Sequence, residues 1–219
     1  MSTQGPACRG VPYRIYGLLS PYAFRARLAK VTYVNAADGK PLTTRYGMFI
    51  EDDSDVARRA GARSIDLPRT LFKDLDQNTL MTMSLFEYMI ANTDVSIYKL
   101  HNVKLLVTES HAEYPVPYDF DYSGLVDTPY AIPNPKLGIA TVRERVYRGP
   151  CVSESDFDGV LEKFRAKKAD VMALYDSVPD LNPSYRRQAR SYLESFYAAT
   201  DRSRLKRMLV DGCTHAPSM

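Results

Sequence analysis

The pattern of apolar and polar positions predicts several short elements in the first quarter of the chain. Residues 13–19 (YRIYGLL) predict a short helix that ends before Pro21, because proline disfavours the helical conformation in the residue preceding it. Apolar and β-branched residues at 28–34 and 46–50 flank an Asp-Gly pair, and this arrangement predicts two strands joined in a hairpin. A short helix over 54–60, closed by a glycine, is expected to follow the second strand.

The most hydrophobic segment spans residues 76–91. Asp76 is a suitable N-cap, and the residues after it are apolar on nearly all sides, which is typical of a helix at the centre of a domain. The polar triplet 92–94 (NTD) ends this segment. A short buried strand is expected at 103–108, followed by a second strand around 116–120 (VPYDF), so that helix, polar loop and hairpin succeed one another.

The second half of the chain is irregular and then helical. Residues 125–150 are rich in proline and glycine and predict an ordered but irregular segment, with a short strand allowed at 139–147. Apolar residues at helical spacing predict a helix capped by Ser153 or Ser155 and another that begins at Pro183. A last helix from Asp201 and a disordered tail over 212–219 complete the expectations.

Composition limits the classes of protein that fit. The chain has 219 residues, of which 45% are hydrophobic and 25% charged, as in ordinary globular proteins of one large or two small domains. The 29 basic and 26 acidic residues are spread along the chain and leave a net charge of only +3, so a nucleic-acid partner is not expected. The oligomeric state has no signature in the sequence.

The cysteines and the apolar runs bear on the cellular location. Cys8, Cys151 and Cys213 are widely separated and odd in number, which predicts neither a disulfide framework nor a zinc site. No apolar run is long enough for a membrane span, and the first residues lack the organisation of a signal peptide. A cytoplasmic location is therefore expected, with Met1 taken as the natural start.

Four polar residues around the predicted hairpin could form one site. Asp94 follows the central helix, Asn102 precedes the first strand, and Asp119 and Asp121 follow the second. Phosphoryl transfer requires a carboxylate that orients the acceptor and oxygen ligands that hold magnesium, and these residue types supply both. The alternative is that Asn-Thr-Asp is ordinary turn chemistry and that the acidic pair is simply solvated. His101 could orient this loop, although a structural histidine fits the pattern better.

The segments MIANTDVSIYKLHNVKLL and VPYDFDYSG resemble the catalytic region of kinase-like phosphotransferases, in particular the HipA-type and CotH-type kinases. The resemblance implies that Asp94 is the catalytic aspartate and that Asn102 and Asp119 are magnesium ligands, with Asp121 as an alternative or helper. It also implies that ATP and Mg²⁺ are the cofactors and that TRYGMFIEDD is the last strand and hinge of an N-lobe. The adenine would then lie against the backbone of Ile50, Glu51 and Asp52.

The fold expected from this resemblance is α+β and protein-kinase-like, with a reduced N-lobe sheet and hinge over 1–53 and a mostly helical C-lobe over 54–219. Two features depart from the family pattern. The spacing from Asp94 to Asn102 is eight residues, where kinases have about five, and no glycine-rich phosphate loop or strand lysine precedes Tyr13.

Three functions follow as alternatives. The first is ATP- and magnesium-dependent phosphotransfer to an acceptor that could be a protein or a small molecule. The second is a catalytically inactive kinase-like protein that binds or scaffolds. The third is a metal-dependent hydrolase that uses the same acids.

Overall fold

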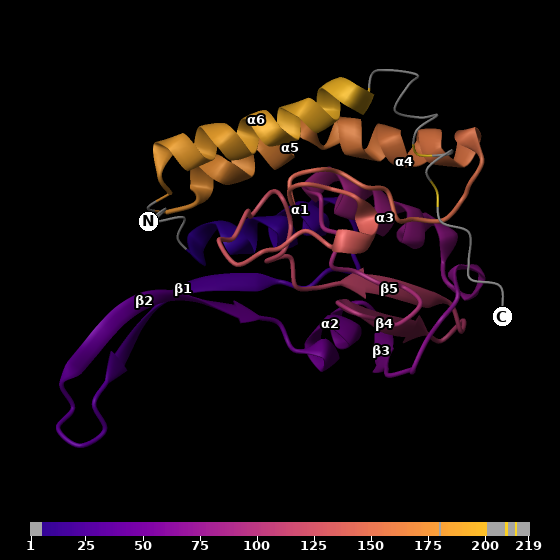
Figure 1. Cartoon of the computed structure of the whole chain (residues 1–219). Helices are drawn as coiled ribbons and strands as arrows, with labels where there is room; N and C mark the ends of the chain where they lie inside the picture. Colours follow the sequence, from indigo (N-terminus) through magenta and orange to yellow (C-terminus); the bar gives the residue numbers. More distant parts are fainter. Residues whose placement is uncertain (1–5, 180, 201–208, 210–212, 214–219) are drawn as a thin grey trace.

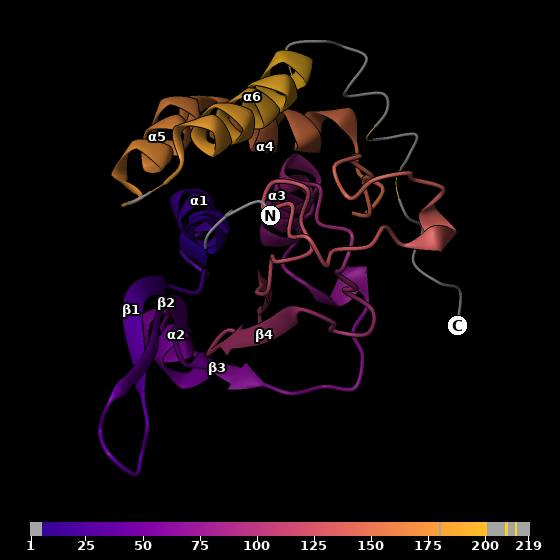
Figure 2. The ribbon, with the colours of Figure 1, turned by 60° about the vertical axis from the view of Figure 1, so that its left-hand side comes forward.

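The structure is a computed structural model that describes residues 6–179, 181–200, 209 and 213. Over these residues the fold is α+β, with six α-helices and two small antiparallel sheets, as the sequence predicts. Figures 1 and 2 show three layers. Helices α4 (Glu154–Ala166), α5 (Lys168–Ala173) and α6 (Pro183–Thr200) lie on one side of α1 (Val11–Leu19) and α3 (Gln77–Ile90), and the sheets lie on the other.

The first sheet is a two-stranded ribbon that extends away from the body (Figure 1). Strands β1 (Ala26–Val34) and β2 (Pro41–Ile50) pair antiparallel, with Ala26 opposite Ile50 at the base. Gly39 adopts a φ of 69° in the connecting turn, a conformation that favours glycine. The predicted hairpin is confirmed.

The central helix α3 (Gln77–Ile90) is the predicted buried helix. The Asp76 side chain caps it by accepting a 2.8 Å hydrogen bond from the Thr79 N–H, which satisfies one of the unpaired donors of the first turn. Every residue from 79 to 90 is buried. Helix α1 (Val11–Leu19), also predicted, packs against α3, so residues assigned to an N-lobe share the core of the body.

The second sheet has the order β3-β4-β5, formed by Ala62–Ile65, Val103–Thr108 and Glu113–Pro117. The sequence predicts β4 correctly, places β5 about three residues too late, and does not predict β3. Helix α2 (Asp53–Arg59) precedes β3 and matches the expected short helix. Three short 3-10 helices, η1 to η3, lie at Pro6–Gly10, Phe72–Asp74 and Pro135–Leu137.

Residues 125–150 form the predicted irregular segment, and the described structure has no strand at 139–147. The helical layer follows with α4 (Glu154–Ala166), α5 (Lys168–Ala173), the 3-10 helix η4 (Leu174–Ser177) and α6 (Pro183–Thr200). Ser153 caps α4 as expected, by accepting from the Asp156 N–H. The helix expected from Asp201 and the tail over 212–219 lie outside the described residues, apart from Leu209 and Cys213.

One expectation from the cysteines is wrong. Cys151 and Cys213, separated by 62 residues, form a disulfide, because the fold brings together two positions whose spacing gives no signal. Disulfides persist mainly in oxidising compartments, so the cysteines no longer support a reducing location, and a cytoplasmic location stays a prediction. Among the described residues, no helix has both the length and the apolar character needed to cross a membrane.

Candidate functional site

The loop after α3 is held in a strained conformation that positions Asp94. Ala91 ends the helix with a φ of 52°, in the left-handed region that residues other than glycine rarely adopt. The next residue, Asn92, is buried; its Oδ1 accepts a 3.1 Å hydrogen bond from the Asp94 N–H, and its Nδ2 donates to the Asp119 carbonyl at 3.5 Å. Asn92 therefore joins the two loops that carry the predicted acids.

Asp94 and Asn102 are in direct contact. The Asn102 Nδ2 donates to the Asp94 carbonyl at 2.8 Å and to the Asp94 Oδ2 at 3.1 Å. Because the amide nitrogen is used in this way, the Asn102 Oδ1 is left as an acceptor. His101 Nε2 lies 3.1 Å from the Asp94 Oδ1, so the histidine also orients the aspartate.

The long spacing between Asp94 and Asn102 is accommodated by a short loop. Ser96 and His101 exchange backbone hydrogen bonds of 3.1 and 3.0 Å, which close the four intervening residues into a turn. The extra residues are thus looped out, and the two polar side chains at the ends of the segment still meet.

Asp119 is placed by the hairpin and by an aromatic anchor. The Tyr118 N–H donates to the Asn102 carbonyl at 3.0 Å, which continues the pairing of β4 and β5 up to Asp119. Phe120 is buried, with its ring centroid 4.7 Å from that of Tyr13 and 5.4 Å from that of Phe86. The Asp119 N–H donates to the Tyr13 hydroxyl at 3.2 Å, so α1 and α3 together fix this loop.

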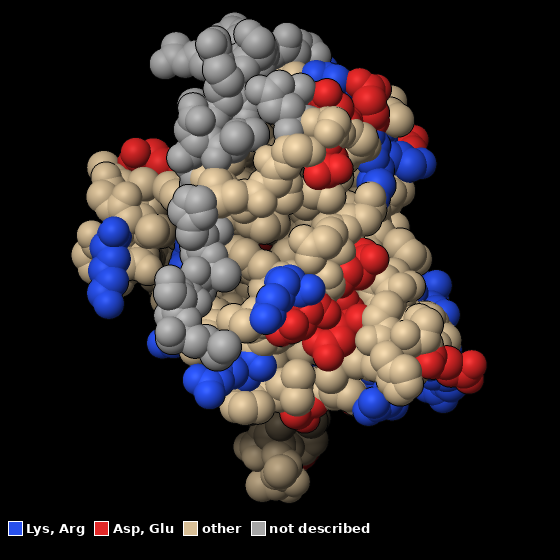
Figure 3. Space-filling model, turned by 90° about the vertical axis from the view of Figure 1, so that its right-hand side faces the viewer, with Lys and Arg blue, Asp and Glu red and all other residues tan. Residues whose placement is uncertain are grey.

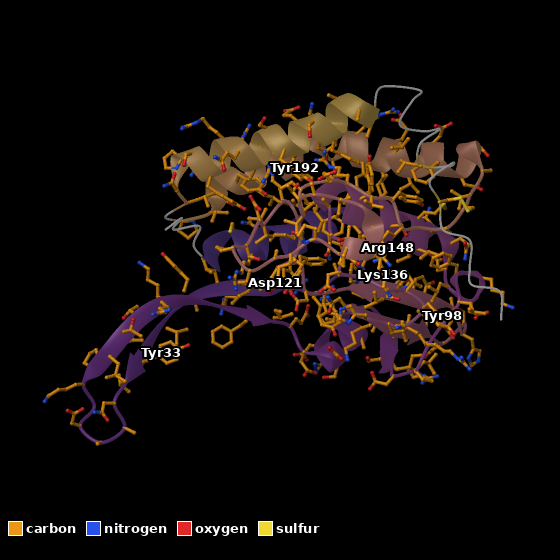
Figure 4. The ribbon with its side chains drawn as sticks, viewed as in Figure 1. Tyr33, Tyr98, Asp121, Lys136, Arg148 and Tyr192 are labelled. Atoms are coloured by element: carbon orange, nitrogen blue, oxygen red, sulfur yellow. A yellow bond between two sulfur atoms is a disulfide. The ribbon has the colours of Figure 1, made fainter. Side chains whose placement is uncertain are left out.

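The electrostatics show that the acids lie near one another. Burial raises the pKa of Asp119, and the negative charges of Asp121 and Asp94 raise it further. The Asp119 Oδ1 accepts from the Asp121 N–H at 3.4 Å, whereas Asp121 uses its Oδ2 to accept a 2.6 Å hydrogen bond from the Tyr130 hydroxyl. In the view of Figure 4, Asp121 lies near the base of the β1–β2 ribbon.

The residues present fit a magnesium site in chemistry but are not arranged as a complete one. Asp119 and Asn102 both offer oxygen atoms, the donors that Mg²⁺ prefers, and a cation would relieve the repulsion among the acids. Among the described residues, however, no group of three or more His, Cys, Asp or Glu side chains is arranged to hold a metal ion. A metal here would need the asparagine oxygen, water or a ligand phosphate to complete its coordination.

The predicted hinge residues lie at the end of β2. Ile50 is 43% exposed, whereas the side chains of Glu51 and Asp52 have structural partners. The Glu51 carboxylate forms a 2.8 Å ion pair with Arg59; burial alone would raise the pKa of Glu51, but the Arg59 hydrogen bond lowers it overall. Asp52 caps α2 through Ser54, which lowers the Asp52 pKa.

An ion pair joins the start of α2, next to the predicted hinge, to strand β4, which follows Asn102. Lys104, two residues after Asn102, lies 2.9 Å from Asp53, the residue after Asp52. Among the described residues, no hydrogen bond or ion pair joins Ile50, Glu51 or Asp52 directly to the acids. The structure therefore brings Asp94, Asn102, Asp119 and Asp121 together.

Two arginines that sequence reasoning missed support the loop from the other side. The Arg148 guanidinium donates to the Thr93 carbonyl at 2.6 Å and the Val95 carbonyl at 2.9 Å, on both sides of Asp94. Arg145 donates to the Met89 carbonyl at 3.0 Å, near the C-terminal end of α3, where a cation also interacts favourably with the helix dipole. Both come from the irregular segment, whose pattern gives no signal of long-range partners.

The face of the molecule shown in Figure 3 carries charged side chains of both signs. On the face shown in Figure 3, the Lys and Arg side chains are scattered, mostly toward the edge, whereas Asp and Glu side chains gather near the centre. A continuous basic field, the electrostatic footprint of nucleic-acid binding, is not seen on this face. Comparison with protein-family models and with curated protein sequences finds no match to this chain.

Proposed function

We propose that this protein transfers a phosphoryl group from ATP, with Mg²⁺ as cofactor, to an acceptor that is a protein or a small molecule. The observation that supports this most strongly is the arrangement around Asp94. Its carboxylate is oriented by His101 and Asn102, and Asn102 does so through its amide nitrogen, which leaves the amide oxygen for a cation.

In this proposal Asp94 positions the acceptor hydroxyl and takes its proton. Asn102 and Asp119 would hold the magnesium ion, which supplies charge neutralisation at the phosphates when it is bound.

ATP turnover tests this proposal without knowledge of the acceptor. We expect slow magnesium-dependent formation of ADP by the wild-type protein, and a loss of about 100-fold or more in Asp94→Asn, in line with removal of a general base. Asp74→Asn is the matched control, because Asp74 is an exposed acid outside the site. Equal turnover in all three proteins would contradict the proposal.

A second candidate is a kinase-like protein that binds nucleotide but does not turn it over. The lack of a complete metal-binding group of acids among the described residues favours it. Binding of ATP without formation of ADP, unchanged by Asp94→Asn, would support this alternative over catalysis.

A further inference from the structure

A cavity of about 180 Å³ lies beside α3, lined by its residues Met83, Ser84, Glu87 and Tyr88 and by Ile97 and Arg148 among others. Cavities of about 150 Å³ with apolar walls bind single-ring molecules such as benzene, so the volume suits a ligand of that size. In Figure 4 Arg148 and Tyr98, two of the lining residues, lie on the side of the molecule away from the ribbon.

Glu87 is the unusual member of this lining. It is 4% exposed, and both of its carboxyl oxygens are buried without a hydrogen bond of ordinary geometry among the described residues, although the Asn92 side chain lies close enough to lower its pKa in part. A buried polar group normally has a partner, since leaving it unpaired costs about 1–3 kcal/mol or more. A buried carboxyl group on a residue that lines a cavity of this size could pair with a donor from outside the chain.

Most hydrogen-bonding groups around Glu87 are engaged with other groups. The Asn92 amide donates to the Asp119 carbonyl and accepts from the Asp94 N–H, which leaves at most one of its N–H groups for Glu87, and the Ser84 hydroxyl donates to the Leu80 carbonyl at 2.8 Å. The Arg148 guanidinium donates to the two backbone carbonyls of the Asp94 loop. Burial lowers the Arg148 pKa, and the acid whose charge offsets part of this decrease is Asp94. Arg148 is therefore not the counter-ion of Glu87.

We propose that this cavity binds a small organic molecule that has one basic nitrogen on an apolar body of about one ring, with the nitrogen paired to Glu87. A monatomic cation fits poorly, because Mg²⁺ and Ca²⁺ require several oxygen ligands and most of this lining is apolar. An organic cation meets both features, since its charge pairs with the carboxylate and its body occupies the apolar walls.

Binding of a cation beside Glu87 should also release a proton, which can be measured separately from the affinity. Burial raises the pKa of Glu87 to about 8, although the Asn92 side chain offsets part of the rise. The carboxyl group is therefore mostly protonated at pH 7, and pairing with a cation would release close to one proton into the buffer. A neutral ligand of the same shape would release none.

The test is a titration of the whole chain with benzylamine and, in parallel, with benzyl alcohol, which has the same body but no charge. Methyl NMR of the methionines locates binding: the Met83 methyl lines the cavity and should shift, whereas Met48, on the ribbon, should not. We expect benzylamine to bind with release of a proton at pH 7, and to bind about tenfold or more tightly than benzyl alcohol.

Glu87→Gln keeps the shape of the side chain and removes its ability to ionise, so it should abolish the preference for benzylamine and the proton release while benzyl alcohol binds as before. Glu113→Gln is the matched control, because Glu113 also has a buried oxygen without a partner but does not line the cavity.

Equal binding of the two probes by the wild-type protein would show an apolar cavity only. No shift of Met83 with either probe would show a cavity that holds water only. Each of these results would overturn the proposal, and neither depends on phosphotransfer.

Discussion

Asn102 and Arg148 hold Asp94 through different chemistry. Asn102 approaches the aspartate itself, whereas Arg148 holds the peptide groups on either side of it. Neither role follows from residue type alone, since both depend on a loop whose two ends are brought together by the Ser96–His101 bridge. The environment of Asp94 is thus set in part by Arg148, which lies 55 positions after Thr93 in the sequence.

Replacement of Asn102 by glycine isolates the contribution of its side chain. Glycine accepts the φ of 57° without strain, so only the hydrogen bonds to Asp94 are lost, and we expect stability to fall by about 1–2 kcal/mol. Asn102→Asp should destabilise the protein further at pH 7, because it places a second carboxylate against Asp94. Urea denaturation measures both, and an Asn102→Asp variant as stable as the wild type would contradict the assigned contact.

Replacement of Arg148 by methionine keeps the apolar stem and removes the guanidinium. Two carbonyls of the Asp94 loop then lose a charged donor, and we expect a loss of about 2–3 kcal/mol in the free energy of unfolding. Arg187→Met is the control, because Arg187 is exposed on α6 and should change stability by less than about 0.5 kcal/mol. Equal losses in the two variants would argue against a specific role for Arg148.

At the scale of elements, the sequence predicted those whose pattern is local. Three of these patterns depend only on residues close together in the sequence: the cap at Asp76, the apolar character of α3 and the Asp-Gly turn of the ribbon. Strand β3 was missed because its four residues, ARSI, have no clear alternation and gain their conformation by pairing with β4. The end of β5 was misplaced because Asp119 leaves the strand with a left-handed backbone.

The same distinction applies to the candidate site. The acids and Asn102 could be recognised because they follow one another in an order that resembles a known motif. Arg145 and Arg148 could not, because their partners lie in α3 and the loop after it, across an irregular segment. Glu87 was hidden in an otherwise apolar helix, where only the cavity and the missing hydrogen bonds mark it.

The burial of Glu87 in α3 predicts a pH dependence of stability. Its pKa is about 8 in the folded protein and 4.5 in the unfolded chain, so between these values the folded state binds more protons. Stability is therefore highest below about pH 4.5 as far as this group is concerned, and falls by a few kcal/mol as the pH rises to about 8. Glu87→Gln should remove this slope, which urea denaturation at pH 5, 7 and 8.5 would reveal. Parallel profiles for the two proteins would contradict the assigned burial.

At the scale of the whole molecule, the Cys151–Cys213 disulfide ties the described C-terminal position to the start of the helical layer. It closes a segment of 62 residues, for which chain entropy alone gives about 4 kcal/mol of stabilisation. We expect the melting temperature of the oxidised protein to fall by several degrees on addition of dithiothreitol. The double variant Cys151→Ser and Cys213→Ser should melt at the lower temperature with or without the reductant. A wild-type melting temperature that is the same with and without dithiothreitol would contradict the presence of the disulfide.

We propose that residues from the loop after α3 and from the two ends of the β4–β5 hairpin form one magnesium-dependent nucleotide site. Thermal stabilisation by ATP, recorded with and without Mg²⁺ in the wild-type protein and in Asp119→Asn, measures this directly. We expect an increase in melting temperature that requires both ATP and Mg²⁺ and is lost in Asp119→Asn but retained in Asp74→Asn. An increase that is independent of Mg²⁺, or that survives in Asp119→Asn, would contradict it.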